Sequence, residues 1–127
     1  DPELKAGAHK ILSRVDLNDQ AYQLVSELAH GERRMLELAL ALATNPSLLL
    51  LDEPMAGVGH QESHRMSQII NDLRGEVAIL LIEHDIDAVF RLADRISVLV
   101  EGVIIASGTA NDISNDPAVQ AAYLGSE

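Results

Sequence analysis

Two apolar runs of strand length, separated by one amphipathic segment, constrain the fold of this chain more than any other feature. The runs are "SLLLL" at residues 47–51 and "EVAILLIEH" at residues 76–84. Between them, residues 61–74 show helical spacing of apolar side chains and end before Gly75, a typical C-terminal stop. The apolar positions of this segment are Met66, Ile69, Ile70 and Leu73. Two strands joined through a helix are expected to be parallel, and their continuous apolar character predicts that both faces of the sheet are covered.

The segments on either side extend this alternation of helices and strands. Residues 6–15 and 31–44 are predicted helices, and Asn45, which precedes Pro46, is expected to leave helical geometry and end the second helix. Asp85 is a candidate cap for a third helix. The apolar stripe of that helix consists of Ile86, Val89, Phe90 and Ala93. The order helix, strand, helix, strand, helix predicts an α/β fold with parallel strands and flanking helices.

The C-terminal part of the sequence predicts a hairpin and short helices. Residues 96–100 and 103–107 are apolar and flank Glu101-Gly102, as in a hairpin with a short turn. Each following helix is framed by residues that typically begin or end one. These residues are Thr109 and Asp112, a capping-box pair, for the first helix, and Asp116, Pro117 and Gly125 for the second.

Composition indicates an acidic globular protein. Of the 127 residues, 47% are hydrophobic, which suffices for a packed core. There are 20 acidic and 9 basic side chains, and the net charge of −11 argues against broad binding to nucleic acid or anionic lipid. The absence of cysteine excludes disulfides and fits a reducing compartment. No apolar run approaches the ~20 residues that span a bilayer, and no leader peptide opens the chain, so we expect a cytoplasmic protein.

Each predicted strand ends in residues that suit metal and water chemistry, Asp52-Glu53 after the first and Glu83-His84 after the second. Parallel sheets bind ligands beyond the carboxyl ends of their strands. Asp52 can hold Mg²⁺ through water, while Glu53 can orient an attacking water. His84 can donate a hydrogen bond to a phosphoryl oxygen. Taken singly, these residues fit plain turn caps and strand ends equally well.

Another candidate site is "LAHGE" at residues 28–32, where a glycine stands at a helix start. Unpaired N–H groups and the helix dipole favour an anion there, although an ordinary glycine turn explains the same pattern. His60 and His64 have the spacing of a zinc helix. Gln61, however, replaces the glutamate of an HExxH site, so we expect both histidines to be solvated.

Read in order, "LAHGERR", "LLLLDEP" and "LLIEHD" resemble the ATP-binding-cassette (ABC) ATPases in motif order and spacing. The resemblance extends from Ala21 to the end and includes "DRISVLVEGVIIASGT", similar to the family's closing hairpin. It implies that Asp52 belongs to the Walker B strand, that Glu53 is the catalytic glutamate and that His84 is the switch histidine. The residues similar to the signature motif are Leu28, Ala29, His30, Gly31 and Glu32, and "MAGVG" at 55–59 falls at the D-loop. "AHGERR", "EPMAGV" and "AAYLG" are most similar to importers of branched-chain amino acids and related small solutes.

The resemblance further implies a partial P-loop NTPase fold. Residues 1–45 would belong to the helical subdomain with the signature motif, and residues 46–127 to the C-terminal part of the ATPase core. The sequence contains no GxxxxGK[ST] motif, and neither Lys5 nor Lys10 is followed by Ser or Thr. In the family, ATP and Mg²⁺ lie between two domains, one supplying the P-loop and Walker B and the other the signature. We therefore expect the isolated chain to bind ATP at best weakly and to have negligible ATPase activity.

Three residues depart from the family pattern. Ala29 stands where a serine hydroxyl contacts the γ-phosphate, so the amides around His30 and Gly31 would have to bind it. Glu32 replaces glutamine and adds negative charge, and Gly59 stands where the D-loop has Asp. Glu53 and His84 match the pattern.

The resemblance implies two kinds of partner, a second ATPase domain and membrane permease subunits that hold the protein at the inner face of the cell membrane. We also expect self-association, because a missing half would expose apolar surface and a strand edge. Two alternatives remain open: an ABC ATPase of DNA repair or translation, against which the acidic composition argues, and a non-enzymatic half-domain that serves as a scaffold or regulator. An upstream P-loop in the reading frame would decide against the half-domain, and the chain's start in mid-domain favours a truncated ATPase.

Overall fold

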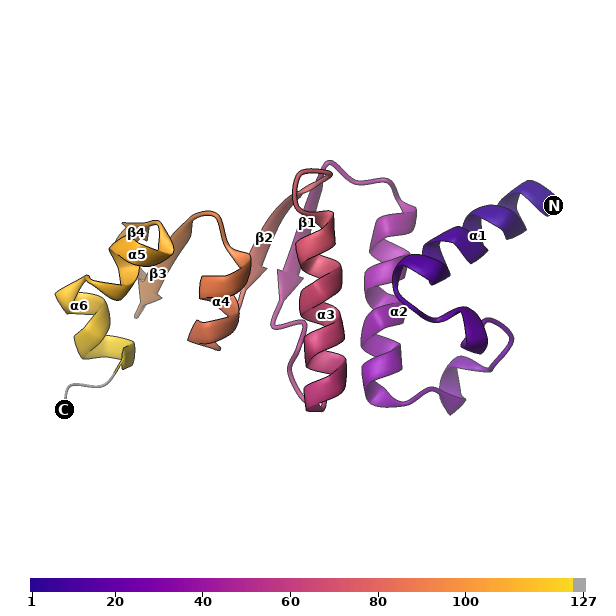
Figure 1. Cartoon of the computed structure of the whole chain (residues 1–127), viewed down its shortest axis with the longest axis horizontal. Coiled ribbons are helices and arrows are strands. Elements are labelled where there is room, and N and C mark those ends of the chain that lie inside the picture. Colours follow the sequence, from indigo (N-terminus) through magenta and orange to yellow (C-terminus); the bar gives the residue numbers. More distant parts are fainter. Residues whose placement is uncertain (125–127) are drawn as a thin grey trace. The chain divides into compact units, whose positions relative to one another are not determined.

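The computed structural model describes residues 1–124, and the chain divides between Glu83 and His84 into two compact units. In the first unit, helices and strands alternate as the sequence predicts (Figure 1). Its elements are α1 (Pro2–Arg14), η1 (Asn18–Gln20), η2 (Val25–Glu27), α2 (His30–Ala43), β1 (Leu48–Asp52), α3 (His60–Leu73) and β2 (Ala78–Ile82). β1 and β2 pair in parallel, which confirms the predicted α/β class.

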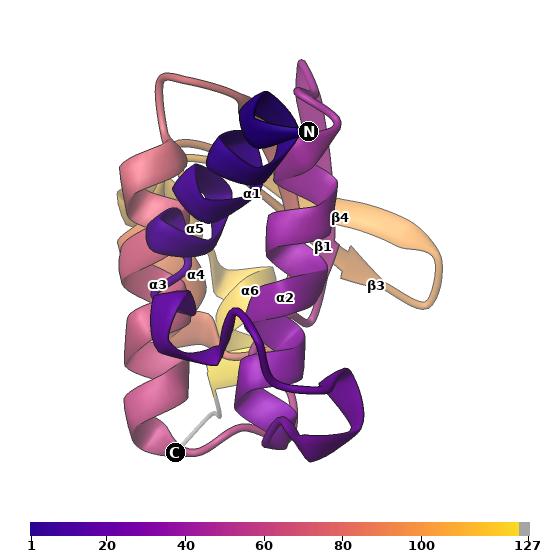
Figure 2. The same cartoon turned by 90° about the vertical axis from the view of Figure 1, so that its right-hand side faces the viewer.

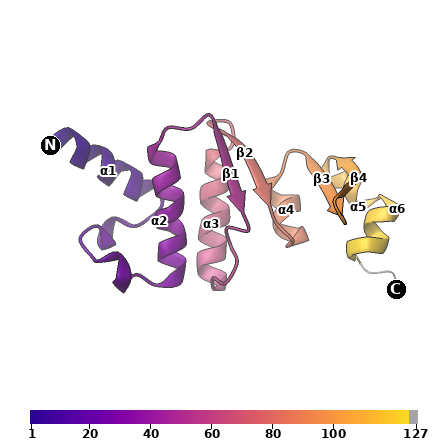
Figure 3. The same ribbon diagram turned by 180° about the vertical axis from the view of Figure 1, so that it is seen from behind.

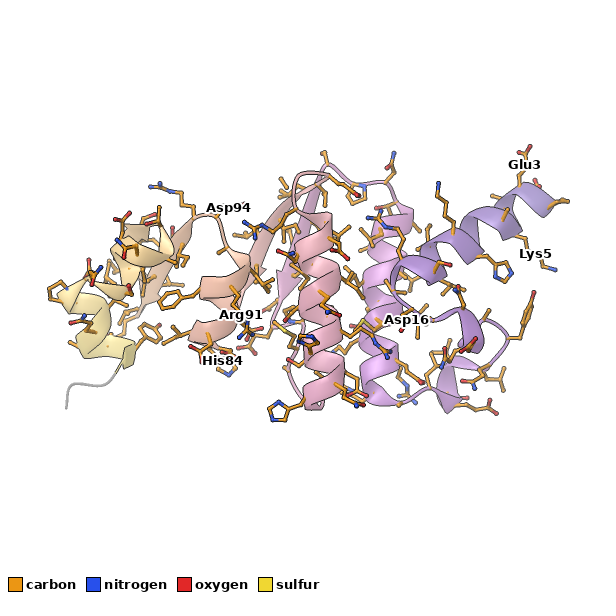
Figure 4. The ribbon with its side chains drawn as sticks, viewed as in Figure 1. Glu3, Lys5, Asp16, His84, Arg91 and Asp94 are labelled. Carbon is orange, nitrogen blue, oxygen red and sulfur yellow. The ribbon has the colours of Figure 1, made fainter. Side chains whose placement is uncertain are left out.

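Local capping determines where these helices begin and end. α1 begins at Pro2 rather than at the predicted residue 6, because the Asp1 carboxylate accepts a hydrogen bond from the Glu3 N–H and caps the helix. Figure 4 labels Glu3 and Lys5, two exposed side chains on this added part of the helix. α2 ends before Asn45, which adopts a left-handed conformation with φ of 53°. This confirms that the residue before Pro46 leaves helical geometry, and asparagine tolerates the left-handed region.

The core of the first unit lies between helices α2 and α3 and one face of the β1–β2 pair. α2 contributes Met35 and Leu38, α3 contributes Ile70 and Leu73, and β1 contributes Leu49, all at most 4% exposed. Burial of Met66, Ile69, Ile70 and Leu73 confirms the predicted stripe of α3. Gly75, with φ of 87°, follows the end of that helix as predicted.

The other face of the β1–β2 pair is open in this chain, as the view from behind shows (Figure 3). Leu50 and its register partner Leu80 are 66% and 56% exposed. The prediction that both faces are covered is therefore wrong for this chain, because the described helices of this unit lie on one face. We define the open face as Leu48, Leu50, Leu80 and Ile82.

The second unit contains the predicted hairpin and short helices. Its elements are α4 (Ile86–Leu92), β3 (Ile96–Val100), β4 (Val103–Gly108), α5 (Ala110–Ser114), α6 (Pro117–Val119) and η3 (Gln120–Leu124). β3 and β4 are antiparallel, and Glu101 and Gly102 both have positive φ, as a tight two-residue turn requires. Asp116 caps α6 as predicted, whereas the predicted stop at Gly125 lies outside the described residues.

In α4, residues outside the predicted apolar stripe are buried as well. Val89, Phe90 and Ala93 pack against a core cluster in this unit, as predicted. The buried residues of α4 itself, however, are Ala88 and Leu92. The cluster consists of Ile96, Val98, Ile113 and Val119. The Asp85 carboxylate accepts a hydrogen bond from the Ala88 N–H at 3.2 Å, which confirms the predicted cap.

The capping box of α5 makes the second unit sensitive to acid. The Thr109 hydroxyl accepts from the Asp112 N–H at 3.2 Å, and the Asp112 carboxylate accepts from the Thr109 N–H at 3.0 Å. The backbone hydrogen bond from Thr109, followed by the bond with its side chain, lowers the pKa of Asp112 below the ordinary 3.8. A group whose folded pKa is lowered stabilises the fold above its unfolded pKa, and that contribution is lost as pH falls through the folded value.

We therefore expect the Asp112→Asn variant to lose less stability than the unsubstituted chain when the pH falls below 3.8, because the amide does not titrate. Urea unfolding followed by circular dichroism over this acidic range measures the effect. The matched control is Asp72→Asn on exposed α3 surface. An Asp112→Asn variant with the same acid dependence as the Asp72→Asn variant would contradict the expectation.

Candidate functional site

The carboxyl ends of β1 and β2 bring acidic residues of two chain segments together. The strands pair up to Asp52 and Ile82, and the Glu53 N–H then donates to the Ile82 carbonyl at 2.8 Å. As a result, carboxylate oxygens of Glu53 and Glu83 lie within 4.8 Å of each other. Glu83 was not assigned a role from the sequence, although its place directly after a strand, like that of Glu53, was the available indication.

The backbone of Glu53 is left-handed, with φ of 45°. Such a conformation costs of order 1 kcal/mol or more for a residue other than glycine, and it is typical of functional sites and sharp turns. It is held by the bond to the Ile82 carbonyl and by a second bond, from the Ala56 N–H to the Glu53 carbonyl at 3.1 Å. Together these bonds turn the chain from β1 into the loop that leads to α3.

The described carboxylates of this unit fit a magnesium ion. Carboxylate oxygens are ligands that Mg²⁺ prefers, and the strand ends supply those of Asp52, Glu53 and Glu83. Asp52 is not part of the close pair of Glu53 and Glu83. It is exposed and shares its side of β1 with Leu48 and Leu50.

His84 follows Glu83 directly and is the first residue of the second unit. Its side chain is exposed and lies beside the first turn of α4 (Figure 4). The boundary between the two units thus lies between Glu83 and His84, the two residues predicted to follow the second strand.

The residues similar to the signature motif form the start of α2. Leu28 is buried and anchors the turn, while Ala29 is the residue before the helix and has no side-chain acceptor to cap it. Glu32 supplies the other half of a capping box, because its carboxylate accepts a hydrogen bond from the Ala29 N–H at 3.0 Å, but it leaves the first N–H groups of the helix uncapped. The negative charge of Glu32 is therefore engaged within its own turn, and the first N–H groups of α2 lack partners within the helix.

Gly59 is the residue before α3, and it lies beside Glu62 of the first turn of that helix. A Cβ atom on Gly59 would stand 3.0 Å from Glu62 Oε2. The loop at 55–59 also approaches the start of α2, since a Cβ on Gly57 would stand 3.2 Å from His30 Nε2. The structure thus brings the loop at 55–59 against the start of α2 within one unit. Nothing in the sequence pattern indicated Glu62.

The sequence matches two family models. The model described as "ABC transporter" matches residues 3–56, and the model described as "Branched-chain amino acid ATP-binding cassette transporter" matches residues 103–127. Together they cover the residues similar to the signature and Walker B motifs and the C-terminal end of the chain.

The chain is also similar to curated proteins of this kind. It is 42% identical to the high-affinity branched-chain amino acid transport ATP-binding protein LivG of Salmonella typhimurium, over 90% of this chain and 46% of that protein. It is 40% identical to the corresponding protein BraF of Pseudomonas aeruginosa, again over 90% of this chain and 46% of that protein. The chain thus spans about half the length of the curated relatives it matches.

A solved structure shares the backbone of nearly the whole chain. It is the ADP conformation of an ATP-binding cassette of an ABC transporter, with a TM-score of 0.85 and 32% identity over 99% of this chain and 52% of that chain. None of the helices in the described part of the present chain is long and apolar enough to cross a membrane. The resemblance inferred from the motifs is confirmed, and the chain belongs to the family of ATP-binding domains of ABC transporters.

Proposed function

We propose that these residues form the C-terminal half of the ATP-hydrolysing subunit of an importer for branched-chain amino acids or related small solutes. The observation that carries the proposal is the pairing of Glu53 and Glu83 at the ends of two parallel strands, with Glu53 in a left-handed conformation. The similarity to LivG and BraF supports the substrate class and argues against DNA repair or translation.

In this proposal the strand-end residues act on ATP that a P-loop holds. Asp52 would hold Mg²⁺ through water, and the ion would supply positive charge against the phosphates. Glu53 accepts a hydrogen bond from the attacking water, orients it and takes up its proton. His84 donates a hydrogen bond to an oxygen of the transferred phosphoryl group.

The signature turn, which we define as residues 28–32, would face ATP held by a second ATPase domain. The N–H groups of His30 and Gly31 stand at the positive end of the α2 dipole, where an anion is stabilised. Ala29 contributes no hydroxyl, so these backbone groups would carry the contact. Gly59, at the D-loop position, contributes backbone alone to the same interface.

The proposal also covers the subdomains of the complete subunit, its partners and its place in the cell. Residues 1–45 would belong to the helical subdomain and residues 46–127 to the ATPase core. The complete subunit would pair with a second ATPase domain and with membrane permease subunits at the inner face of the cell membrane. It requires no nucleic acid, in keeping with a net charge of −11.

A chimera tests the proposal. Residues 1–127 replace the matching 46% of Salmonella LivG, which supplies the rest of the cassette. We expect the chimera to hydrolyse ATP and to restore branched-chain amino acid uptake in cells that lack that protein. The isolated 127-residue chain, which contains no GxxxxGK[ST], should show negligible turnover. A folded chimera that binds ATP but neither hydrolyses it nor supports uptake would overturn the proposal in favour of a non-enzymatic half-domain.

A further inference from the structure

We infer that His30 and Glu62 are positioning residues that join the signature turn to the 55–59 loop, so that the two segments move together. The contacts that carry this inference lie within the first unit. Its consequence for catalysis rests on the proposed function, whereas the mechanical link itself does not.

The first contact is between Glu62 and Gly31. α2 and α3 run side by side and begin at the same end of the unit (Figures 1 and 2). A Cβ on Gly31 would stand 2.5 Å from Glu62 Cγ and 3.0 Å from Glu62 Cβ, closer than carbon atoms can approach. The aliphatic part of Glu62 therefore lies directly across Gly31, which is buried. Glycine at this position provides space for a neighbouring helix in addition to exposing backbone N–H groups.

The second contact is between His30 and Gly57. Gly57 has φ of 74°, a conformation that glycine adopts readily. A Cβ on Gly57 would stand 3.2 Å from His30 Nε2 and 3.7 Å from His30 Cδ2, so the imidazole ring lies over this glycine. Glu62 also lies beside Gly59, so each positioning residue lies beside one glycine of the loop, and the Ser67 hydroxyl contacts Met55 Sδ at 3.2 Å.

The linked loop is attached closely to Glu53. Pro54 alone separates Glu53 from the loop, and Pro54 is buried. The hydrogen bond from the Glu53 N–H to the Ile82 carbonyl fixes the other side of Glu53 to β2. If the signature turn faces ATP of a second domain, a movement of that turn would displace the 55–59 loop through His30 and Glu62. The loop would in turn displace Glu53.

Hydrogen exchange of the 127-residue chain, at low protein concentration and followed by mass spectrometry, tests the link. We expect His30→Ala to accelerate exchange in peptides covering residues 55–59 by about fivefold or more, because the loop loses the imidazole ring that lies over Gly57. His64→Ala, which removes another exposed histidine of the same unit, is the matched control and should leave this loop unchanged. Equal exchange in the His30→Ala and His64→Ala variants would overturn the inference.

A second pair of variants separates packing from charge at Glu62. Glu62→Ala should accelerate exchange both in the loop and in the first turn of α2, whereas Glu62→Gln, which keeps the aliphatic length, should restore protection. Failure of Glu62→Gln to restore it would overturn the packing argument. These readouts need no nucleotide. If the chimera is inactive but the His30 and Glu62 variants change hydrogen exchange as expected, only the proposed function is refuted. If the chimera is active but these variants leave exchange unchanged, only the link is refuted.

Discussion

Replacing Glu53 by glutamine in the LivG chimera is expected to lower kcat for ATP hydrolysis by about 10²–10⁴-fold, the usual contribution of a general base. Glutamine keeps the size of the side chain and can still accept a hydrogen bond from water, but it cannot take up the proton. Because the change acts on the chemical step, KM for ATP should change far less than kcat. Steady-state phosphate release at saturating ATP measures the effect.

The chain itself offers a matched control for this substitution. Glu101 also has a left-handed backbone, with φ of 50° against 45° for Glu53, so Glu101→Gln makes the same chemical change in the same backbone conformation. Glu101 lies in the β3–β4 turn, for which we assign no role in hydrolysis. We expect the Glu101→Gln chimera to keep kcat within about twofold of the unsubstituted chimera. If the kcat of the Glu53→Gln chimera stays within about tenfold of that of the unsubstituted chimera, Glu53 is not the general base.

The parts of the fold that depend on local chemistry were predictable from the sequence. The capping box at Thr109 and Asp112, the Glu101-Gly102 turn and the end of α2 before Pro46 each depend on residues close together in the chain. The two apolar runs predicted the parallel strands, because a helix between two strands restricts how they can pair. Coverage of the sheet was predicted wrongly, since an apolar strand indicates that both faces need covering but not which chain segment covers them.

The candidate site was predictable in position and not in detail. The order of the motifs located Asp52, Glu53, His84 and the signature turn, because each follows or precedes a regular element. Neither the left-handed backbone of Glu53 nor the contact of Glu62 with Gly31 could be predicted. Both depend on how α2, α3 and the strands pack in space, and residues far apart in the sequence meet there without any characteristic spacing.

The open face of the β1–β2 pair is expected to cause self-association of the isolated chain. Its four side chains are between 54% and 66% exposed, and they lie next to each other in the parallel register. Burial of apolar surface stabilises association by about 25 cal/mol per Å², and a two-stranded sheet also presents unpaired strand edges. We therefore expect a second copy to cover this face at concentrations of about 100 µM, in the range where exposed apolar surface promotes association.

A double substitution on this face should convert the associated chain to a monomer. In the Leu50→Lys, Leu80→Lys variant, two charges at register partners would have to be buried together in any contact across the face, which costs several kcal/mol. Sedimentation velocity at about 100 µM measures the change in mass. The matched control is the Leu4→Lys, Leu40→Lys variant, which adds the same charge at helix residues that are 74% and 63% exposed, and it should remain associated. An unsubstituted chain that is monomeric at this concentration would refute the expectation, as would a control variant that dissociates equally.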